Sequence, residues 1–176
     1  MSGKDKHIKE VLETIIEKDN IGKNLKGYFS SISERDMRRA IFILSNIYPD
    51  KINMSDSEFE FIIYMFSNIK IIQQDNFFEF VRAVNVIDFS DRQKNVLKKI
   101  IKEHLEALCE KCIFELDSLI IKVFEPTELI EYISNNIANS TSSLMQHFES
   151  ILRDKSLSHN NNAKNELKLL KAKLNL

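Results

Sequence analysis

The near absence of glycine is the feature that most restricts the fold of this chain. Of 176 residues only three are glycine, and none occurs from Tyr28 to Leu176. Antiparallel β folds need turn residues about every ten positions, and phosphate-binding loops are built from glycine. With only two prolines in addition, the chain cannot supply such turns and loops. The sequence therefore favours an all-α fold and disfavours dinucleotide-binding and P-loop enzymes.

Hydrophobic residues recur at intervals of three and four along most of the chain, as expected for helices that each bury one face. We predict a single all-α domain over residues 1–176 with seven or eight helices. Their expected ranges are about 5–18, 33–48, 55–69, 76–87, 90–125, 127–138, 142–153 and 163–175. Gly22 and Gly27 are expected to lie between helices, around a short irregular or helical-turn segment. The polar segment 156–162 is expected to be a loop before the last helix.

Two arrangements of these helices remain open. A helix over 90–125 would be about 50 Å long if straight, so we expect a break near 109–114. Residues 33–47 resemble residues 55–69 at an offset of 22, which suggests a HEAT-like stack of helical hairpins, with an irregular bundle as the alternative. The helices at 55–69 and 76–87 are apolar on most sides, which places them near the centre.

An acidic segment supplies the candidate binding residues. Residues 50–88 contain seven acidic and three basic residues, a local charge of −4. Such a segment is either a solvated face or a docking surface for a basic partner. The candidate partner-binding residues are Asp56, Glu58, Glu60, Asp75, Glu79 and Asp88, with Tyr64 as an aromatic anchor. Phe61 is a further anchor if it is exposed, and a core residue if its helix is central.

Cys109 and Cys112 form the one motif in the sequence that suggests a chemical activity. A redox CxxC pair needs a thiol of lowered pKa, whereas here Cys112 continues an apolar helical stripe, which favours a buried structural role. The helical peroxidases of the alkylhydroperoxidase D family carry a histidine shortly after the second cysteine, and residues 113–116 contain none. As zinc ligands, the two cysteines and His104 lack a visible fourth partner. We therefore predict no catalytic, cofactor-binding or metal-binding residues.

Charge and hydropathy also bear on the cellular setting. Twenty-five basic and 26 acidic residues give a net charge of −1, without the basic excess typical of nucleic-acid binders. The longest apolar run, residues 61–66, is far shorter than the roughly 20 residues that span a membrane. No secretory leader is visible at the start. We expect a cytoplasmic protein that binds neither nucleic acid nor membrane, with the lysines of 164–173 on the outer face of a terminal helix.

The segments Ser33–Pro49, Ser55–Ile69 and Phe77–Ile87 carry acidic residues between aromatic ones on successive amphipathic helices. In this they resemble the small all-helical immunity proteins of bacterial toxin–immunity pairs, including those of contact-dependent growth inhibition. The resemblance implies a bacterial, cytoplasmic, non-catalytic inhibitor that occludes the active site of a toxin domain. A basic nuclease toxin would suit the local charge of −4.

Two alternatives from other classes stay open beside this interpretation. The first is a helical thiol-redox enzyme that uses Cys109 and Cys112. The second is a regulatory adaptor, viral or phage in origin, that binds a partner helix in an apolar groove. The sequence leaves the oligomeric state open.

Overall fold

The computed structural model describes residues 3–18, 20–47, 54–154 and 164–174, and these ranges contain ten α-helices, one short 3₁₀ helix and no strand. The predicted all-α class is confirmed, with more helices than the seven or eight expected. The helices are α1 (Gly3–Ile16), α2 (Ile21–Ser31), α3 (Glu34–Ile47), α4 (Asp56–Ser67), α5 (Ile69–Ile72), α6 (Phe77–Val84), α7 (Asp91–Val123), α8 (Pro126–Asn136), η2 (Ile137–Asn139), α9 (Ser142–Arg153) and α11 (Lys164–Lys173). The predicted loop at 156–162 lies outside the described residues.

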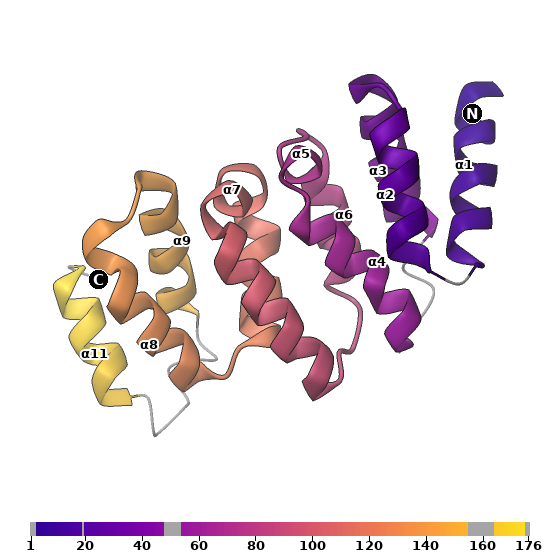
Figure 1. Ribbon diagram of the computed structural model, residues 1–176. Helices are drawn as coiled ribbons and strands as arrows, with labels where there is room; N and C mark the ends of the chain where they lie inside the picture. Colours follow the sequence, from indigo (N-terminus) through magenta and orange to yellow (C-terminus); the bar gives the residue numbers. More distant parts are fainter. Residues whose placement is uncertain (1–2, 19, 48–53, 155–163, 175–176) are drawn as a thin grey trace.

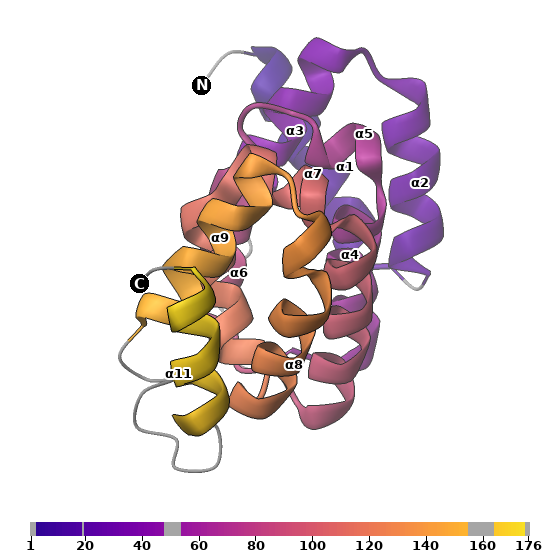
Figure 2. The ribbon, with the colours of Figure 1, turned by 90° about the vertical axis from the view of Figure 1, so that its left-hand side faces the viewer.

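The helices stack in two rows (Figures 1 and 2). In the first row α1 packs on α3, α3 on α6, α6 on the end of α7, and α7 on α9. In the second row α2 packs on α4, α4 on the start of α7, and α8 on α11. Because no single hairpin can bury both of its faces, each is stabilised by its neighbours in the stack. Of the two predicted arrangements, the stack of helical hairpins is the one that the chain adopts.

The stack repeats every 35 residues, as the N-terminal caps of three helices show. Before α4, α7 and α8, the backbone N–H of the preceding residue donates to a side chain three residues further on, at 3.0 Å in each case. The three pairs are Ser55–Glu58, Ser90–Gln93 and Glu125–Glu128. The offset of 22 seen in the sequence is not the repeat, because it relates α3 of the first row to α4 of the second.

Helix α7 is bent twice and contributes to both rows. Its backbone leaves helical geometry at His104 (φ −119°, ψ 15°) and at Cys112 (φ −149°, ψ 41°). The second bend lies within the predicted interval 109–114, and the first was not predicted. The bends divide α7 into segments 91–103, 105–111 and 113–123, the same long–short–long order as α4–α5–α6 and α8–η2–α9. Neither bend contains glycine or proline, so tertiary packing rather than a helix-breaking residue produces this hairpin.

The prediction that Gly22 and Gly27 lie between helices is wrong, because both belong to α2. Each glycine costs the helix about 1 kcal/mol relative to alanine. Burial of Ile21, Leu25 and Phe29 along one face outweighs that cost, since each such side chain contributes about 1.5–3 kcal/mol. The turn before α2 instead uses Asn20, whose φ of 61° is the one positive value in the described ranges.

The core is one continuous apolar cluster that is richest in aromatic residues at α4 and α6. Phe61, Phe66, Phe77 and Phe80 are fully buried, with neighbouring ring centroids 5.4–6.0 Å apart. The central position of these two helices is thereby confirmed, and Phe61 is a core residue rather than a surface anchor. In the described part of the chain, every helix is too short or too polar to cross a lipid bilayer.

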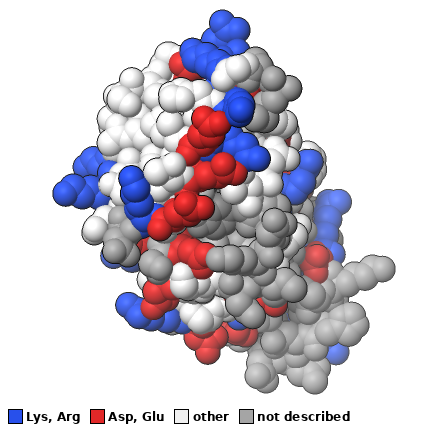
Figure 3. All heavy atoms as spheres, turned by 90° about the vertical axis from the view of Figure 1, so that its right-hand side faces the viewer, with Lys and Arg blue, Asp and Glu red and all other residues white. Residues whose placement is uncertain are grey.

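The N-terminal end of the stack is polar. Lys6 and Glu10 of α1 form an ion pair at 3.9 Å, and Lys9 and Glu13 form another at 3.5 Å. Figure 3 shows a band of acidic side chains running across this end of the molecule, with basic ones at its margins. A polar outer face is what a terminal helix of a stacked-helix protein needs, because nothing further packs on it.

Candidate functional site

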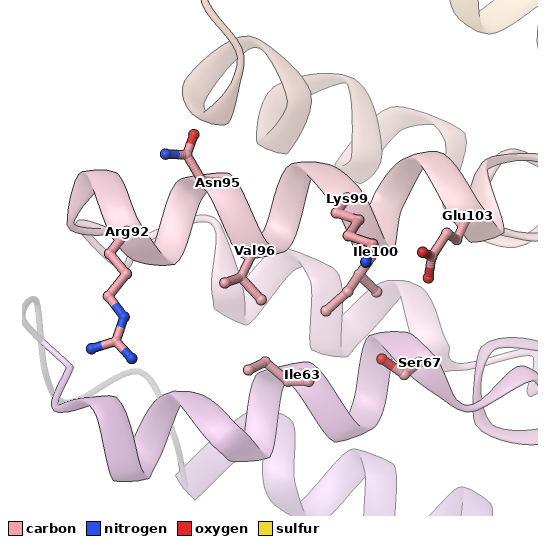
Figure 4. A pocket seen from close by; sticks show the side chains of 8 residues that line it. All are labelled: Ile63, Ser67, Arg92, Asn95, Val96, Lys99, Ile100 and Glu103. Atoms are coloured by element: carbon pink, nitrogen blue, oxygen red, sulfur yellow. The ribbon is translucent and has the colours of Figure 1, made fainter.

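A groove between α4 and the first segment of α7 is the leading candidate site (Figure 4). Its volume is about 800 Å³, and a second hollow of about 320 Å³ continues it toward the start of both helices. The larger hollow is lined by Ile63, Ser67, Arg92, Asn95, Val96, Lys99, Ile100 and Glu103. The smaller one shares three of these residues and adds Asp56, Phe59, Glu60 and Gln93. Together they form an open trough along two adjacent helices.

Helical geometry explains the composition of this groove. On α7, Leu97 and Ile101 point into the core and are fully buried. Val96 and Ile100 lie one position earlier in each turn, at the edge of that buried stripe. Val96 remains 37% exposed, and the half-buried Ile63 faces it from α4. The groove therefore has an apolar floor of aliphatic side chains.

Charged side chains form the rim of the groove. Arg92 Nη1 lies 2.8 Å from Asp56 Oδ2, and both side chains are largely exposed, so this ion pair contributes little to stability. Lys99 and Glu103 are exposed and form no ion pair within the described residues. Glu60 extends over the first turn of α2, where a Cβ on Gly22 would lie 3.7 Å from Oε2. Cations and anions are thus both available to a bound partner.

The structure brings two of the seven predicted binding residues, Asp56 and Glu60, to this groove. Glu58 instead caps α4, where its carboxylate accepts from the Ser55 backbone N–H and hydroxyl. Tyr64 is half-buried with its ring 5.9 Å from that of Phe29. Burial raises the pKa of Tyr64 above its ordinary value, against a smaller opposing effect of the Asn68 amide, which donates to its hydroxyl.

The other three predicted residues lie away from the groove. Asp75, between α5 and α6, pairs with Lys111 at 3.1 Å. Asp88, after α6, pairs with Lys122 at 3.4 Å. Glu79 is on α6 in the first row. The acidic segment of the sequence is therefore divided between two rows. Three of its carboxylates, those of Asp56, Asp75 and Asp88, already form ion pairs with basic residues of the same chain.

Sequence reasoning missed the α7 side of the groove, namely Val96, Lys99, Ile100 and Glu103. One signal was present. Val96 and Ile100 flank the stripe of Leu97 and Ile101, which makes the apolar face of this segment wider than one row of contacts requires. A wide apolar face that continues into charged residues indicates a helix with a partially covered side. Which helix lies opposite could not be read from the sequence.

The two cysteines are buried thiols. Burial, reinforced by the nearby Glu115 and Asp117 carboxylates, raises the pKa of Cys112 to about 12. Burial also raises the pKa of Cys109, with a smaller contribution from Asp117. The Cys112 thiol donates to the Leu108 carbonyl at 3.1 Å. Protonated, enclosed thiols are poor nucleophiles, and no group of metal-ligating residues is assembled within the described ranges, the trio with His104 included.

A buried polar pair, His147 and Asp117, links α7 to α9. His147 Nδ1 lies 2.5 Å from Asp117 Oδ1, with the histidine side chain 1% exposed. A buried donor without a partner would cost about 1–3 kcal/mol, so this contact satisfies both groups and holds the two helices together. Because the pair is enclosed between two helices, its role is structural.

Comparison with known proteins adds no relative to this description. The chain matches no protein-family model, no curated protein and no solved structure at a significant level.

Proposed function

We propose that this chain is a non-catalytic binding protein that neutralises a toxin domain, with the groove between α4 and α7 as its binding site. One observation carries the proposal: an open trough with an aliphatic floor and a charged rim, built on a stack of helices. Protein interfaces have this composition, with an apolar centre surrounded by polar residues. The resemblance to bacterial immunity proteins supplies the toxin as the partner and the cytoplasm as the compartment.

The mechanism would be steric occlusion of the toxin's active site. An apolar side chain of the partner would insert between Ile63, Val96 and Ile100, and such buried anchors provide most of the energy of an interface. Basic residues of a nuclease toxin would meet Glu60 and Glu103 on the rim. Because several acidic residues already have intrachain partners, we expect charge to raise the association rate more than the affinity.

A regulatory adaptor that captures a partner helix is the second candidate. The groove lies along two neighbouring helices (Figure 4), an arrangement that suits an amphipathic helix with apolar anchors every three or four residues. The thiol-redox alternative has less support, because the buried cysteines have raised pKa values.

The test is co-expression with a growth-inhibiting toxin domain identified among the products of the neighbouring genes. Val96→Glu places a charge in the apolar floor and should abolish rescue of growth and binding measured by calorimetry. Leu169→Glu is the matched control, because Leu169 is 65% exposed and does not line the groove; it should preserve both. Full rescue by Val96→Glu would exclude the groove as the site.

Charge reversal separates the two candidates. For electrostatic docking of a basic toxin, Glu60→Lys with Glu103→Lys should slow association at low salt about tenfold or more, whereas Glu79→Lys on the other row should not. A complex indifferent to both the reversal and salt would contradict a basic partner and favour capture of an apolar helix.

A further inference from the structure

The outer face of the first row is unusually apolar for a solvent-exposed surface. Six large hydrophobic side chains are exposed in the described residues, and three of them lie on α3, just after α6 and on α7. These are Phe42 at 52%, Val86 at 53% and Phe114 at 81%. Single exposed hydrophobic residues are ordinary, but several on adjacent helices indicate an interaction surface.

The two sides of this face carry opposite free charges. On α3, Arg35 and Arg38 are exposed and neither forms an ion pair within the described residues. On α7, Glu110 is exposed and likewise has no basic partner among them. Phe42 lies one to two turns after the arginines, and Phe114 follows Glu110 across the bend at Cys112. Each side thus combines a charge with an aromatic anchor.

The middle of the face, on α6, is held in a fixed arrangement. The Arg82 guanidinium lies 5.4 Å from the centre of the Phe78 ring and 2.8 Å from the Glu115 carboxylate. Arg82 nevertheless keeps 66% of its side chain exposed. Arginine and aromatic residues are enriched in protein interfaces, and a side chain already held in place loses less entropy on binding.

We propose that this face binds a second copy of the same chain about a two-fold axis that runs parallel to the helices over α6. This operation places α3 of each copy opposite residues 110–123 of α7 of the other. Arg35 then faces Glu110, and Phe42 meets Phe114, each contact occurring twice as a two-fold interface requires.

Charge complementarity favours a second copy over an unrelated partner. The face is positive at α3 and negative at Glu110, just before the second bend of α7, so a uniformly acidic or basic partner would meet like charge at one side. Two copies related by the axis satisfy both sides at once. The groove between α4 and α7 lies on the opposite row and stays open in such a dimer. The proposal is independent of the function proposed for that groove.

The test is the mass of the purified full chain by sedimentation velocity and light scattering, from about 1 to about 100 µM. We expect a concentration-dependent dimer. Phe114→Glu should raise the dissociation constant of the dimer about 30-fold or more, as loss of a buried aromatic anchor does, without lowering the melting temperature, because Phe114 is exposed in the protomer. Val96→Glu, on the other row, should leave the dimer unchanged. A monomer throughout the range, or a dimer indifferent to Phe114→Glu, would overturn the proposal.

A charge swap tests the proposed register. Arg35→Glu and Glu110→Arg should each weaken the dimer several-fold, because each places two like-charge contacts in the interface. The combined variant should regain most of the lost affinity at low salt. Failure of the combined variant to recover would show that these two residues do not face each other.

Discussion

The interior of the stack differs between the α4–α6 region and the α7–α9 region. Phe77, Cys112 and His147 follow one another at intervals of 35 residues, and all three are buried. In the α4–α6 region this position belongs to a purely aromatic cluster. In the α7–α9 region it is occupied first by a thiol and then by a histidine that needs Asp117 as its partner.

This difference shows what the repeat specifies. The geometry of the stack determines that the position is buried, whereas the chemistry of the side chain is free to vary if each buried polar group has a partner. The 35-residue period is therefore visible in helix starts and burial but faint in residue identity. It also makes the two regions respond differently to mutation.

The largest effect should come from the aromatic region. Phe80→Ala removes a fully buried ring that contacts Phe61, Phe66 and Phe77, and should lower the free energy of unfolding by about 3–5 kcal/mol. Urea denaturation followed by circular dichroism measures it. Phe114→Ala is the control, with an expected change within about 0.5 kcal/mol for the isolated protomer at low concentration. Equal losses for both would contradict the assigned core.

The polar region should show a coupled response. Asp117→Leu or His147→Leu alone leaves one buried polar group without a partner and should cost about 1–3 kcal/mol. The double variant should cost clearly less than the sum of the two, because it removes both polar groups together. A double-mutant cycle in urea measures this coupling. Strict additivity would show that the two side chains do not act as a pair.

The smallest effect should be a loss of stability in alkaline solution caused by the two cysteines. An ordinary thiol pKa is about 9.0, while the folded chain holds Cys112 at about 12 and Cys109 also above its ordinary value. Above pH 9 the unfolded chain therefore loses thiol protons that the folded chain retains, so stability falls as pH rises. We expect a loss of about 1 kcal/mol per thiol at pH 10 relative to pH 8.

The variant Cys109→Ala with Cys112→Ala provides the comparison, because it removes both thiols and keeps all four tyrosines. Its stability should fall less between pH 8 and pH 10 than that of the unmodified chain. Parallel pH profiles would mean that the thiols are not held protonated by the fold.

Much of the local structure was predictable from the sequence. The range 142–153 coincides with α9, and the caps Ser55 and Ser90 begin helices where expected. Helix α2 was missed because its two glycines indicated an interruption, while the stabilising burial of Leu25 depends on a distant helix. The period of 35 was missed because its third cap is Glu125, a residue that rarely caps helices.

The sequence by itself determined where most of the helices lie, because apolar periodicity and capping act between residues a few positions apart. Tertiary structure decided which charges remain free. Asp56 pairs with Arg92, Asp75 with Lys111 and Asp88 with Lys122, and in each pair the residues are about one 35-residue repeat apart. Stacking one unit on the next creates these contacts, so a local charge count along the chain overstates the acidity of the folded surface. The same stacking places Val96 opposite Ile63, which creates the groove.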